Sequence, residues 1–283
     1  MNILVTGSKG QLGSEIQMLE KNLKYRYLFT DALQLDITAR EGVMSFFKNN
    51  KIDLVVNCAA YTQVDKAEVE TEIAYKVNCQ AVGYLVDACR QYNAKMIHIS
   101  TDYVFSGNKN TPYTEQDLEA PIGVYGKTKF EGEQIIKQSA IPYLIIRTSW
   151  LYSQFGHNFL KTIMRLSAEQ ELLKVVYDQV GTPTNAADLA QFIVYVVEND
   201  LLNNQQEIYH FSNEGVCSWY DFASAIVRLK KRSSVVKPCF SDEFPSKVTR
   251  PNYSVLDKTK LKKDFGWHIN NWYDSLEKCI NNM

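Results

Sequence analysis

The sequence predicts an α/β protein with a doubly wound parallel sheet and a smaller C-terminal lobe. Three observations indicate this: short apolar strands alternate with amphipathic helices, a glycine-rich turn joins the first strand to the first helix, and the alternation loosens after Trp150. Such alternation is typical of parallel sheets covered by helices on both faces. The 283 residues are 45% hydrophobic, enough for one large domain or two unequal ones. We expect residues 1–150 to form one domain and residues 151–283 mainly a second lobe.

The first strand is predicted at residues 2–6, and a turn with three glycines at residues 7–13 follows it. Apolar residues then recur at helical spacing, at Leu12, Ile16, Leu19 and Leu23. Strand, glycine turn and helix in this order are the context of a Rossmann-type dinucleotide fingerprint. Here the spacing is G-x-x-G-x-x-G rather than G-x-G-x-x-G.

In that interpretation, each glycine of the turn has its own task. Gly7 permits the tight turn, Gly10 lets the backbone approach a pyrophosphate, and Gly13 allows close packing of helix on strand. The phosphates would lie at the helix amino terminus, where free N–H groups and the helix dipole favour anions. We therefore expect a nicotinamide dinucleotide, NADPH or NADH, to bind here.

The second strand, predicted at residues 25–29, leads to Asp31. An acid near this position commonly accepts the ribose 2′-hydroxyl and favours NADH. Asp31 could also be a turn residue, and Lys9 or Thr30 could receive a 2′-phosphate, so the choice of cofactor stays open. Asp36 and Ile37 are expected to flank the adenine; the alternative for Asp36 is a helix cap.

The alternation continues through the first half. A strand at residues 53–56 leads into small residues, and Ala59 and Ala60 there would let a flat cofactor lie against backbone. A helix is predicted at residues 70–91, with a buried stripe at Ile73, Val77, Ala81, Leu85 and Ala88. Strands at 95–99 and 143–146 flank a helix around Tyr125, and Pro121 fits that helix's first turn.

The second half has a less regular pattern. Helices are predicted at 156–169, 186–197, 218–230 and 271–281, strands at 172–176 and 208–211, and a loop at 246–251. We expect this half to form a smaller lobe over the carboxyl edge of the sheet. Whether the elements near 186–212 rejoin the first domain is left open.

Tyr125 and Lys129 are the candidate catalytic pair. In a helix they share one face, and a lysine ammonium beside a phenol lowers a tyrosine pKa that starts near about 10. Thr101 follows the predicted strand at 95–99, and ligands of open α/β sheets bind at the carboxyl ends of strands. The alternative for Tyr-x-x-x-Lys alone is a solvated pair on a helix.

Composition argues against several other classes of protein. The net charge of −1 disfavours a dedicated nucleic-acid binder. The six cysteines show no C-x-x-C pair, and the four histidines are scattered singly, so no metal signature is present. No apolar run reaches the length of about 18 residues that a membrane span needs, and the amino terminus lacks a signal-peptide pattern. We expect a soluble, cytoplasmic protein with reduced cysteines.

Taken together, the motifs resemble the extended short-chain dehydrogenase/reductase family. The matching segments are residues 10–13 (GQLG), 57–68 (NCAAYTQVDKAE), 100–105 (STDYVF), 125–129 (YGKTK), 147–152 (RTSWLY), 178–184 (DQVGTPT) and 250–251 (RP). The resemblance implies reduction of the 4-keto group of dTDP-4-dehydro-L-rhamnose to give dTDP-L-rhamnose, a nucleotide-sugar step of surface polysaccharide biosynthesis.

The resemblance also implies roles for single residues. Tyr125 donates a proton to the C4 oxygen as hydride arrives from the nicotinamide, Lys129 lowers the pKa of Tyr125 and holds the ribose, and Thr101 hydrogen-bonds the carbonyl. Gln11 and Leu12, within the glycine turn, are implied cofactor contacts. The implied substrate contacts are Asp102, Trp150, Asn158 and Arg250. Several residues also have a purely structural alternative. Trp150 could be an aromatic residue of the domain interface, and Arg250 a surface loop residue. Asn57 and Asn78 could simply form hydrogen bonds with backbone groups.

One local feature separates this chain from the related sugar-nucleotide dehydratases. Those enzymes place Asp-Glu after the threonine, whereas Asp102-Tyr103 follows Thr101 here, so elimination of water is disfavoured. Alternatives left open are a reductase or epimerase of another nucleotide-sugar, and a non-enzymatic regulatory subunit like that of methionine adenosyltransferase. The chain is expected to be a monomer or a homodimer. Glu15 is a candidate ligand for a dimer-linking Mg²⁺, although a single acid on a helix is usually solvated.

Overall fold

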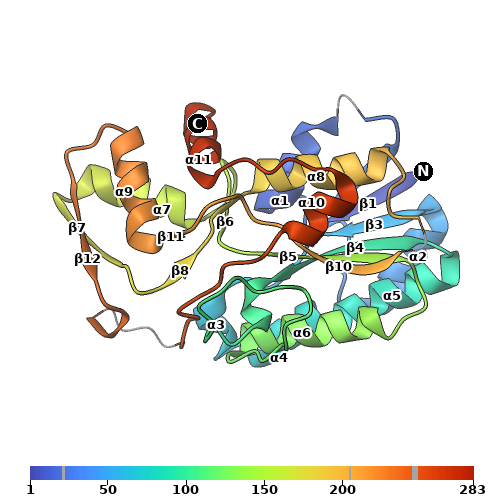
Figure 1. Ribbon diagram of the computed structural model, residues 1–283. Coiled ribbons are helices and arrows are strands. Elements are labelled where there is room, and N and C mark those ends of the chain that lie inside the picture. The colour runs from blue at the N-terminus through green and yellow to red at the C-terminus, as the bar shows by residue number, and fades with distance from the viewer. Residues whose placement is uncertain (21–22, 204, 244–247) are drawn as a thin grey trace.

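The computed structural model describes residues 1–20, 23–203, 205–243 and 248–283 (Figure 1). Its centre is a six-stranded sheet in the order β10-β5-β4-β3-β1-β2, and every neighbouring pair is parallel. The strands are β1 (Asn2–Thr6), β2 (Arg26–Thr30), β3 (Leu54–Asn57), β4 (Lys95–Thr101), β5 (Tyr143–Thr148) and β10 (Gln206–His210). The predicted doubly wound parallel sheet is confirmed.

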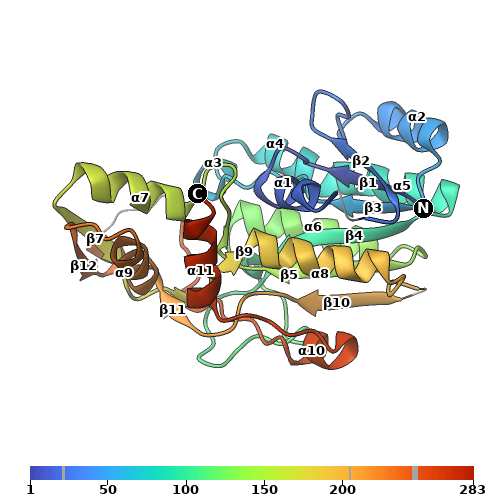
Figure 2. The ribbon, with the colours of Figure 1, turned by 90° about the horizontal axis from the view of Figure 1, so that it is seen from above.

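Helices cover both faces of the sheet (Figures 1 and 2). On one face lie α1 (Gln11–Met18) and α8 (Ala186–Glu198), which pack against each other and share a core with alternate residues of β1, such as Ile3 and Val5. On the other face lie α2 (Arg40–Asn50), α5 (Ala81–Tyr92) and α6 (Val124–Lys137). Strand side chains alternate between faces, so Leu4 of β1 belongs to this second core.

A smaller lobe lies beside the sheet, on the left in Figure 1. Its helices are α7 (Phe159–Glu169), α9 (Trp219–Leu229) and α11 (Trp272–Asn281). Its strands form three small pairs: β7 (Leu172–Val176) with β12 (Val235–Cys239), β8 (Val180–Gly181) with β11 (Cys217–Ser218), and β6 (Leu151–Tyr152) with β9 (Thr184–Asn185). A separate apolar core of aromatic and aliphatic residues holds these elements together.

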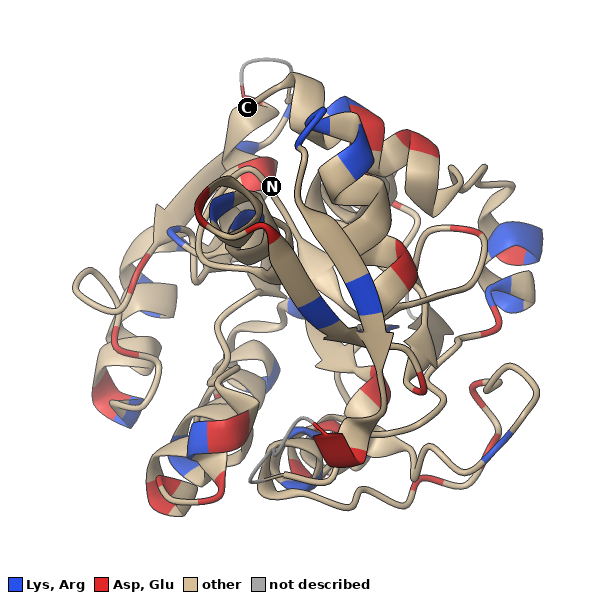
Figure 3. Ribbon diagram, turned by 90° about the vertical axis from the view of Figure 1, so that its left-hand side faces the viewer, with Lys and Arg blue, Asp and Glu red and all other residues tan. Residues whose placement is uncertain are grey.

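Elements near 186–212 belong to the sheet rather than to the lobe. Helix α8 packs on α1, and β10 pairs with β5 along its whole length. Helix α10 (Thr259–Phe265) then packs beside β10. Two 3₁₀ turns occupy Asp102–Val104 and Ser241–Glu243. In the view of Figure 3, basic and acidic residues are interspersed over the helices and loops.

The predicted helix at 70–91 is interrupted. It consists of α4 (Thr71–Tyr75), a π-helical segment (Lys76–Gln80) and α5. Hydrogen bonds from i to i+5 widen the turn and shift the buried face by about one residue. The predicted stripe is therefore wrong at its start: Ala74 is buried, whereas Ile73 is exposed.

Several predicted bounds needed correction. Helix α1 ends at Met18, so Leu23 packs against the core from outside it. Pro121 precedes α6, which begins at Val124 after the cap residue Gly123. Helix α7 begins at Phe159 because the side chain of Asn158 accepts the N–H of Lys161 and caps it.

Two further differences concern helices and a loop. Helices α2 and α3 (Val64–Ala67) were not predicted. Of the predicted loop 246–251, residues 246 and 247 lie outside the described residues. Within the described part of the chain, every helix is too short or too polar to cross a membrane.

Candidate active site

Thr101 is the last residue of β4, and it is buried at the carboxyl edge of the sheet. Its hydroxyl donates to Asp102 Oδ1 at 3.0 Å and accepts the N–H of Tyr103 at 3.2 Å. This second bond caps the 3₁₀ turn that follows the strand. The threonine hydroxyl is thus oriented by its own backbone neighbours at the point where ligands of α/β sheets bind.

Helix α6 brings Tyr125 and Lys129 to the same edge. Gly126 makes this approach possible, because a Cβ atom there would lie 2.3 Å from the carbonyl oxygen of Tyr103. The Tyr125 ring meets the Tyr103 ring edge-on, with centroids 5.4 Å apart and planes at 74°. Tyr125 is half-buried and Lys129 is only 1% exposed. Thr101, Tyr125 and Lys129 are therefore brought together as predicted, and the solvated-pair alternative is wrong.

The amine of Lys129 points into the protein. Its Nζ donates to the carbonyl oxygen of Ile99 at 2.6 Å and lies 3.2 Å from His98 Nε2. Burial lowers the pKa of Lys129 to about 8, while the charge of Glu133 acts in the opposite direction. This lysine therefore titrates far closer to neutrality than an exposed one.

The expected lowering of the Tyr125 pKa is not found. Burial raises this pKa to about 12, and the nearby carboxyl of Asp102 adds to the increase. A hydrogen bond with Thr101 acts in the opposite direction. Since the Lys129 amine is engaged with Ile99 and His98, it does not offset the burial of the phenol. Tyr125 is thus a protonated phenol at neutral pH, suited to donating a proton.

Asp102 is a buried carboxyl beside Thr101. Burial raises its pKa to about 7, although hydrogen bonds from Thr101 and Ser254 act in the opposite direction. Among the described residues, its Oδ2 atom has no partner within hydrogen-bond distance. A buried carboxyl with one free oxygen is a candidate contact for a hydroxyl-rich ligand.

The glycine turn has the shape that a diphosphate needs. Gly7 has a φ of +66°, and a Cβ atom there would lie 2.8 Å from the backbone nitrogen of Ala59. At Gly13 a Cβ would lie 2.4 Å from the Gly7 carbonyl oxygen. Any side chain at these positions would collide with backbone, so bare backbone faces the amino terminus of α1. These residues fit a dinucleotide pyrophosphate.

The acids after β2 have local partners. Asp31 forms an ion pair with Lys9 and accepts the N–H of Leu33 at 3.0 Å. The hydrogen bond from Lys9 lowers the pKa of Asp31. Asp36 accepts the N–H and the hydroxyl of Thr38, at 2.9 and 2.7 Å, in a turn before α2. It does not cap α2, whose cap residue is Ala39, so the alternative of a helix cap is wrong.

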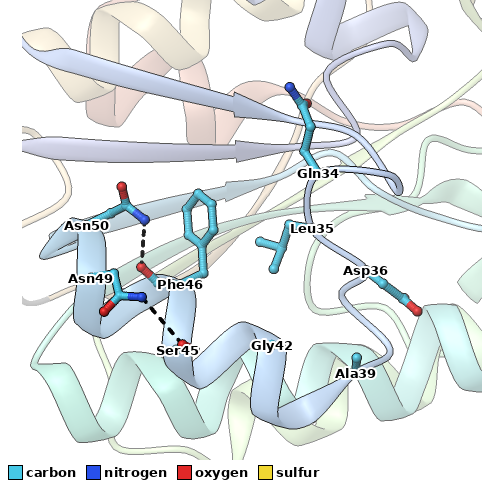
Figure 4. A pocket seen from close by; sticks show the side chains of 9 residues that line it. All are labelled: Gln34, Leu35, Asp36, Ala39, Gly42, Ser45, Phe46, Asn49 and Asn50. Carbon is cyan, nitrogen blue, oxygen red and sulfur yellow. Dashed lines mark hydrogen bonds between the residues drawn. The ribbon is translucent and has the colours of Figure 1, made fainter.

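A groove of about 400 Å³ lies beside this turn (Figure 4). It runs between Asp36 and α2, and Leu35 and Phe46 provide apolar walls. Buried Ile37 lies within this turn, between Asp36 and Thr38. None of Thr101, Tyr125 and Lys129 lines this groove, so it is not the place of the chemistry. The groove begins in the segment with Leu35 and Asp36, which follows β2, and extends along α2 to Asn50.

The predicted substrate contacts are spread over the lobe and its border. Trp150 has a φ of +48° and stacks on Trp219, with centroids 3.6 Å apart and planes at 9°. A left-handed backbone is costly for a tryptophan and must be held by its surroundings. Arg250 pairs with Asp65 of α3 at 2.9 Å. Trp150 is thus part of the lobe's aromatic core, and Arg250 already has an acidic partner.

Asn158 connects the lobe to the glycine turn. Its amide donates to Gln11 Oε1 at 2.9 Å and to the carbonyl oxygen of Ser153 at 2.7 Å, while its Oδ1 caps α7. Gln11 also donates to the Leu151 carbonyl oxygen at 3.4 Å. The side chain is fully used in these bonds, which favours a role in positioning Gln11 over direct contact with a substrate.

The sequence leaves Glu15 as either a metal ligand or a solvated acid. It is instead buried and accepts the Ser153 hydroxyl at 2.6 Å, so the solvated interpretation is wrong. No group of three or more His, Cys, Asp and Glu side chains among the described residues could hold a metal ion. The cysteines are all free thiols, as expected for a reduced protein.

Sequence reasoning overlooked His98 beneath the site, and the alternative of backbone satisfaction for Asn57 is wrong, because the Asn57 amide bonds to the side chains of Thr6 and His98. His98 contacts Lys129, and Asn57 contacts His98 at 3.0 Å. The available signal was a histidine inside the apolar run 95–99, where a buried polar side chain needs a partner. The Asn78 side chain accepts the N–H of Tyr61 and donates to the Tyr61 carbonyl oxygen, as its structural alternative predicts.

A parallel sheet with a glycine turn after β1, Thr101 at the end of β4, and Tyr125 and Lys129 on α6 is the arrangement of a Rossmann-type, nucleotide-dependent reductase. The sequence model described as "RmlD substrate binding domain" matches residues 1–283. The chain therefore belongs to the RmlD family.

Individual relatives match over nearly the whole chain. A dTDP-4-dehydrorhamnose reductase of Aggregatibacter actinomycetemcomitans is 38% identical, with 97% of each chain covered. The crystal structure of a dTDP-4-dehydrorhamnose reductase from Clostridium acetobutylicum is 43% identical, with a TM-score of 0.95, and covers 100% of this chain and 99% of that one. A dTDP-4-dehydrorhamnose reductase from Bacillus anthracis, solved in complex with NADP, is 36% identical, with a TM-score of 0.93 and the same coverage.

Proposed function

We propose that this protein reduces the 4-keto group of dTDP-4-dehydro-L-rhamnose with NADPH or NADH, giving dTDP-L-rhamnose. The observation that carries the proposal is the convergence of Thr101, Tyr125 and Lys129 at one sheet edge. It occurs in a chain whose relatives named dTDP-4-dehydrorhamnose reductase match it from end to end.

Tyr125 is the proton donor in this proposal. When bound, the reduced nicotinamide supplies the hydride that ends on C4 of the sugar. Because burial keeps Tyr125 protonated, its phenol gives its proton to the C4 oxygen, which becomes basic as the carbonyl is reduced. Thr101 hydrogen-bonds the same oxygen, which requires its hydroxyl hydrogen to turn away from Asp102 Oδ1.

The glycine turn and its neighbours hold the cofactor. Gly7, Gly10 and Gly13 leave backbone bare for the pyrophosphate, and Ala59 and Ala60 line the adjoining strand end. The charges of Asp31 and Lys9 set the preference between NADH and NADPH, because a carboxylate repels a 2′-phosphate and an ammonium attracts it. Comparing KM for the two cofactors in the wild type and in Asp31→Asn measures this preference.

The lobe holds the nucleotide-sugar. Trp150 presents an aromatic edge at the border of sheet and lobe, and Arg250 exchanges its Asp65 partner for the diphosphate. Asn158 acts by fixing Gln11. In this division, residues 1–150 with the elements near 186–212 bind the cofactor, and the rest of 151–283 binds mainly the substrate. We further propose that the enzyme works in the cytoplasm as a monomer or homodimer, which light scattering after gel filtration would measure.

The direct test is consumption of reduced nicotinamide by the purified protein. We expect oxidation of NADPH or NADH only when dTDP-4-dehydro-L-rhamnose is added, and dTDP-L-rhamnose as the product. Turnover only with another keto-sugar nucleotide would contradict the substrate assignment. Cofactor binding without turnover on any of several keto-sugars, together with a stoichiometric enzyme partner in a pull-down, would point to a regulatory subunit instead.

A further inference from the structure

A line of buried polar side chains crosses the sheet beneath the site. Thr6 of β1, Asn57 of β3 and His98 of β4 are register partners on three adjacent strands. Side chains paired in this way lie on the same face of a sheet. All three are at most 1% exposed. The line therefore results from strand pairing and is not a surface arrangement.

Each hydrogen bond along this line determines which atom is the donor in the next one. The N–H of Ala59 donates to Thr6 Oγ1 at 3.3 Å, so the Thr6 hydroxyl gives its own hydrogen to Asn57 Oδ1 at 2.6 Å. With its oxygen so engaged, Asn57 presents its Nδ2 hydrogens to His98 Nδ1 at 3.0 Å. His98 Nδ1 must accept, and the ring hydrogen of a neutral His98 then lies on Nε2.

The line ends at Lys129. His98 Nε2 lies 3.2 Å from Lys129 Nζ, which in turn donates to the Ile99 carbonyl oxygen at 2.6 Å. The ring is neutral, since burial and then the charge of Lys129 lower the pKa of His98 well below its ordinary value. A ring N–H facing the amine offers a hydrogen bond to a neutral amine and opposes an ammonium.

Other titratable groups near Lys129 are already satisfied or neutral. Glu133, four residues further along α6, is paired with Arg147 at 2.6 Å. Burial raises the pKa of Cys58, just after β3, to about 12, so it is a neutral thiol. Among the described residues, His98 is thus the one side chain within hydrogen-bond distance of the Lys129 amine.

We propose that His98 is a positioning residue for the reduction: Thr6 and Asn57 hold its ring hydrogen on Nε2, and the ring thereby fixes the direction and the protonation of the amine of Lys129, which lies one helical turn after Tyr125. This inference rests on the proposed function for its catalytic consequence. The tautomer of His98 follows from the fold alone, because Thr6 and Asn57 are neighbours in the sheet whatever the substrate is.

The tautomer is tested first, on the wild-type protein. With only four histidines in the chain, ¹⁵N-histidine labelling and long-range ¹H–¹⁵N correlation resolve each ring. We expect His98 to show a neutral Nε2–H ring across the pH range in which the protein is folded. A ring protonated on Nδ1, or an imidazolium near neutral pH, would overturn the proposal. This measurement needs no substrate, so it is independent of whether the proposed reaction occurs.

The catalytic consequence is tested with His98→Asn, which retains an amide near Asn57 but is too short to reach Lys129. We expect kcat to fall by about 10- to 100-fold, and the limb of the kcat–pH profile that belongs to Lys129 to move to higher pH, toward the ordinary lysine value. The matched control is His210→Asn. His210 is equally buried in β10 of the same sheet, where its Nδ1 contacts the Tyr113 carbonyl oxygen.

The control separates positioning from packing. Both variants lose a buried ring and are expected to lose similar stability, but only His98→Asn should change kcat and its pH profile. If the two variants lose activity in proportion to stability, with pH profiles unchanged, His98 is merely structural and the proposal is wrong. A wild type with no turnover would instead contradict the proposed function and leave the tautomer result standing.

Discussion

The sheet and the lobe are stabilised in different ways. The sheet edge carries buried charges and polar groups: the Arg147–Glu133 pair, Lys129 and Asp102. The lobe is held by aromatic packing, with the stacked, partly buried rings of Trp150 and Trp219 against its apolar core. The parallel strands of the six-stranded sheet hold polar side chains in a fixed register. The two-residue strands of the lobe are too short to do this. We infer that substitutions of the buried polar groups of the sheet strongly alter stability, catalysis or pH dependence, whereas substitutions at the helix caps and exposed ion pairs of the lobe change stability little and leave kcat unchanged.

The largest effect is expected at Tyr125. Tyr125→Phe removes the proton donor and retains the ring that packs on Tyr103, so kcat should fall by about 10³-fold while Tm changes little. Steady-state kinetics and a thermal melt measure the two quantities. A variant with full turnover would show that Tyr125 does not donate the proton.

Breaking the buried ion pair is expected to reduce stability most. Glu133→Gln leaves the fully buried Arg147 guanidinium with the Glu119 carboxylate as its remaining charged partner, at a cost of about 3–5 kcal/mol in the free energy of unfolding. Urea unfolding measures it.

The matched control for this pair lies in the lobe. Glu169→Gln breaks the exposed Arg165–Glu169 pair of α7, and we expect a change within about 1 kcal/mol. Equal losses in the two variants would contradict the contrast between the regions.

The pH dependence of stability should depend on Asp102. Its folded pKa of about 7 lies above the ordinary value of 3.8, so the stability contributed by the protonated carboxyl is complete at acid pH and is lost as pH rises through about 7. Asp102→Asn removes this loss. Its Tm should exceed that of the wild type by several degrees at about pH 8 and match it at about pH 4.

A difference between the two proteins that does not change with pH would contradict this account of Asp102. Melting curves over the whole range, with both proteins in the same buffers, decide between the outcomes.

The smallest effect is expected in the lobe, at the start of α9. Ser218 accepts the N–H of Asp221 at 3.1 Å, and the Asp221 carboxylate accepts the Ser218 N–H at 2.9 Å. Ser218→Ala removes half of this capping box and should cost about 1 kcal/mol in the free energy of unfolding, with kcat unchanged. A large loss of kcat would place the lobe closer to the chemistry than we infer.

The sheet was the predictable part of this chain. Its strands are runs of buried apolar residues bounded by turn signals, so β1 and β4 were found to within two residues. The placement of the proposed catalytic residues was also predictable, because Thr101, Tyr125 and Lys129 stand in segments that resemble a known family. These features depend on local patterns that folding leaves intact.

Other features depend on contacts that no local pattern reveals. The π-helical segment before α5 displaced Ile73 from the buried face, and the pairing of β7 with β12 joins segments far apart in the sequence. The predicted lowering of the Tyr125 pKa was wrong, since this pKa is raised. Helical spacing places Lys129 on the expected face of the helix, but it does not show that the Ile99 carbonyl and His98 engage the Lys129 amine.

The most direct test of the central claim is to follow the transferred hydrogen. With NADPH and NADH each deuterated at the transferring position and dTDP-4-dehydro-L-rhamnose as substrate, this account predicts that at least one of them gives dTDP-L-rhamnose with deuterium on C4 and none elsewhere on the sugar. A product without deuterium at C4, or both cofactors remaining unconsumed in the presence of the keto-sugar, would contradict it.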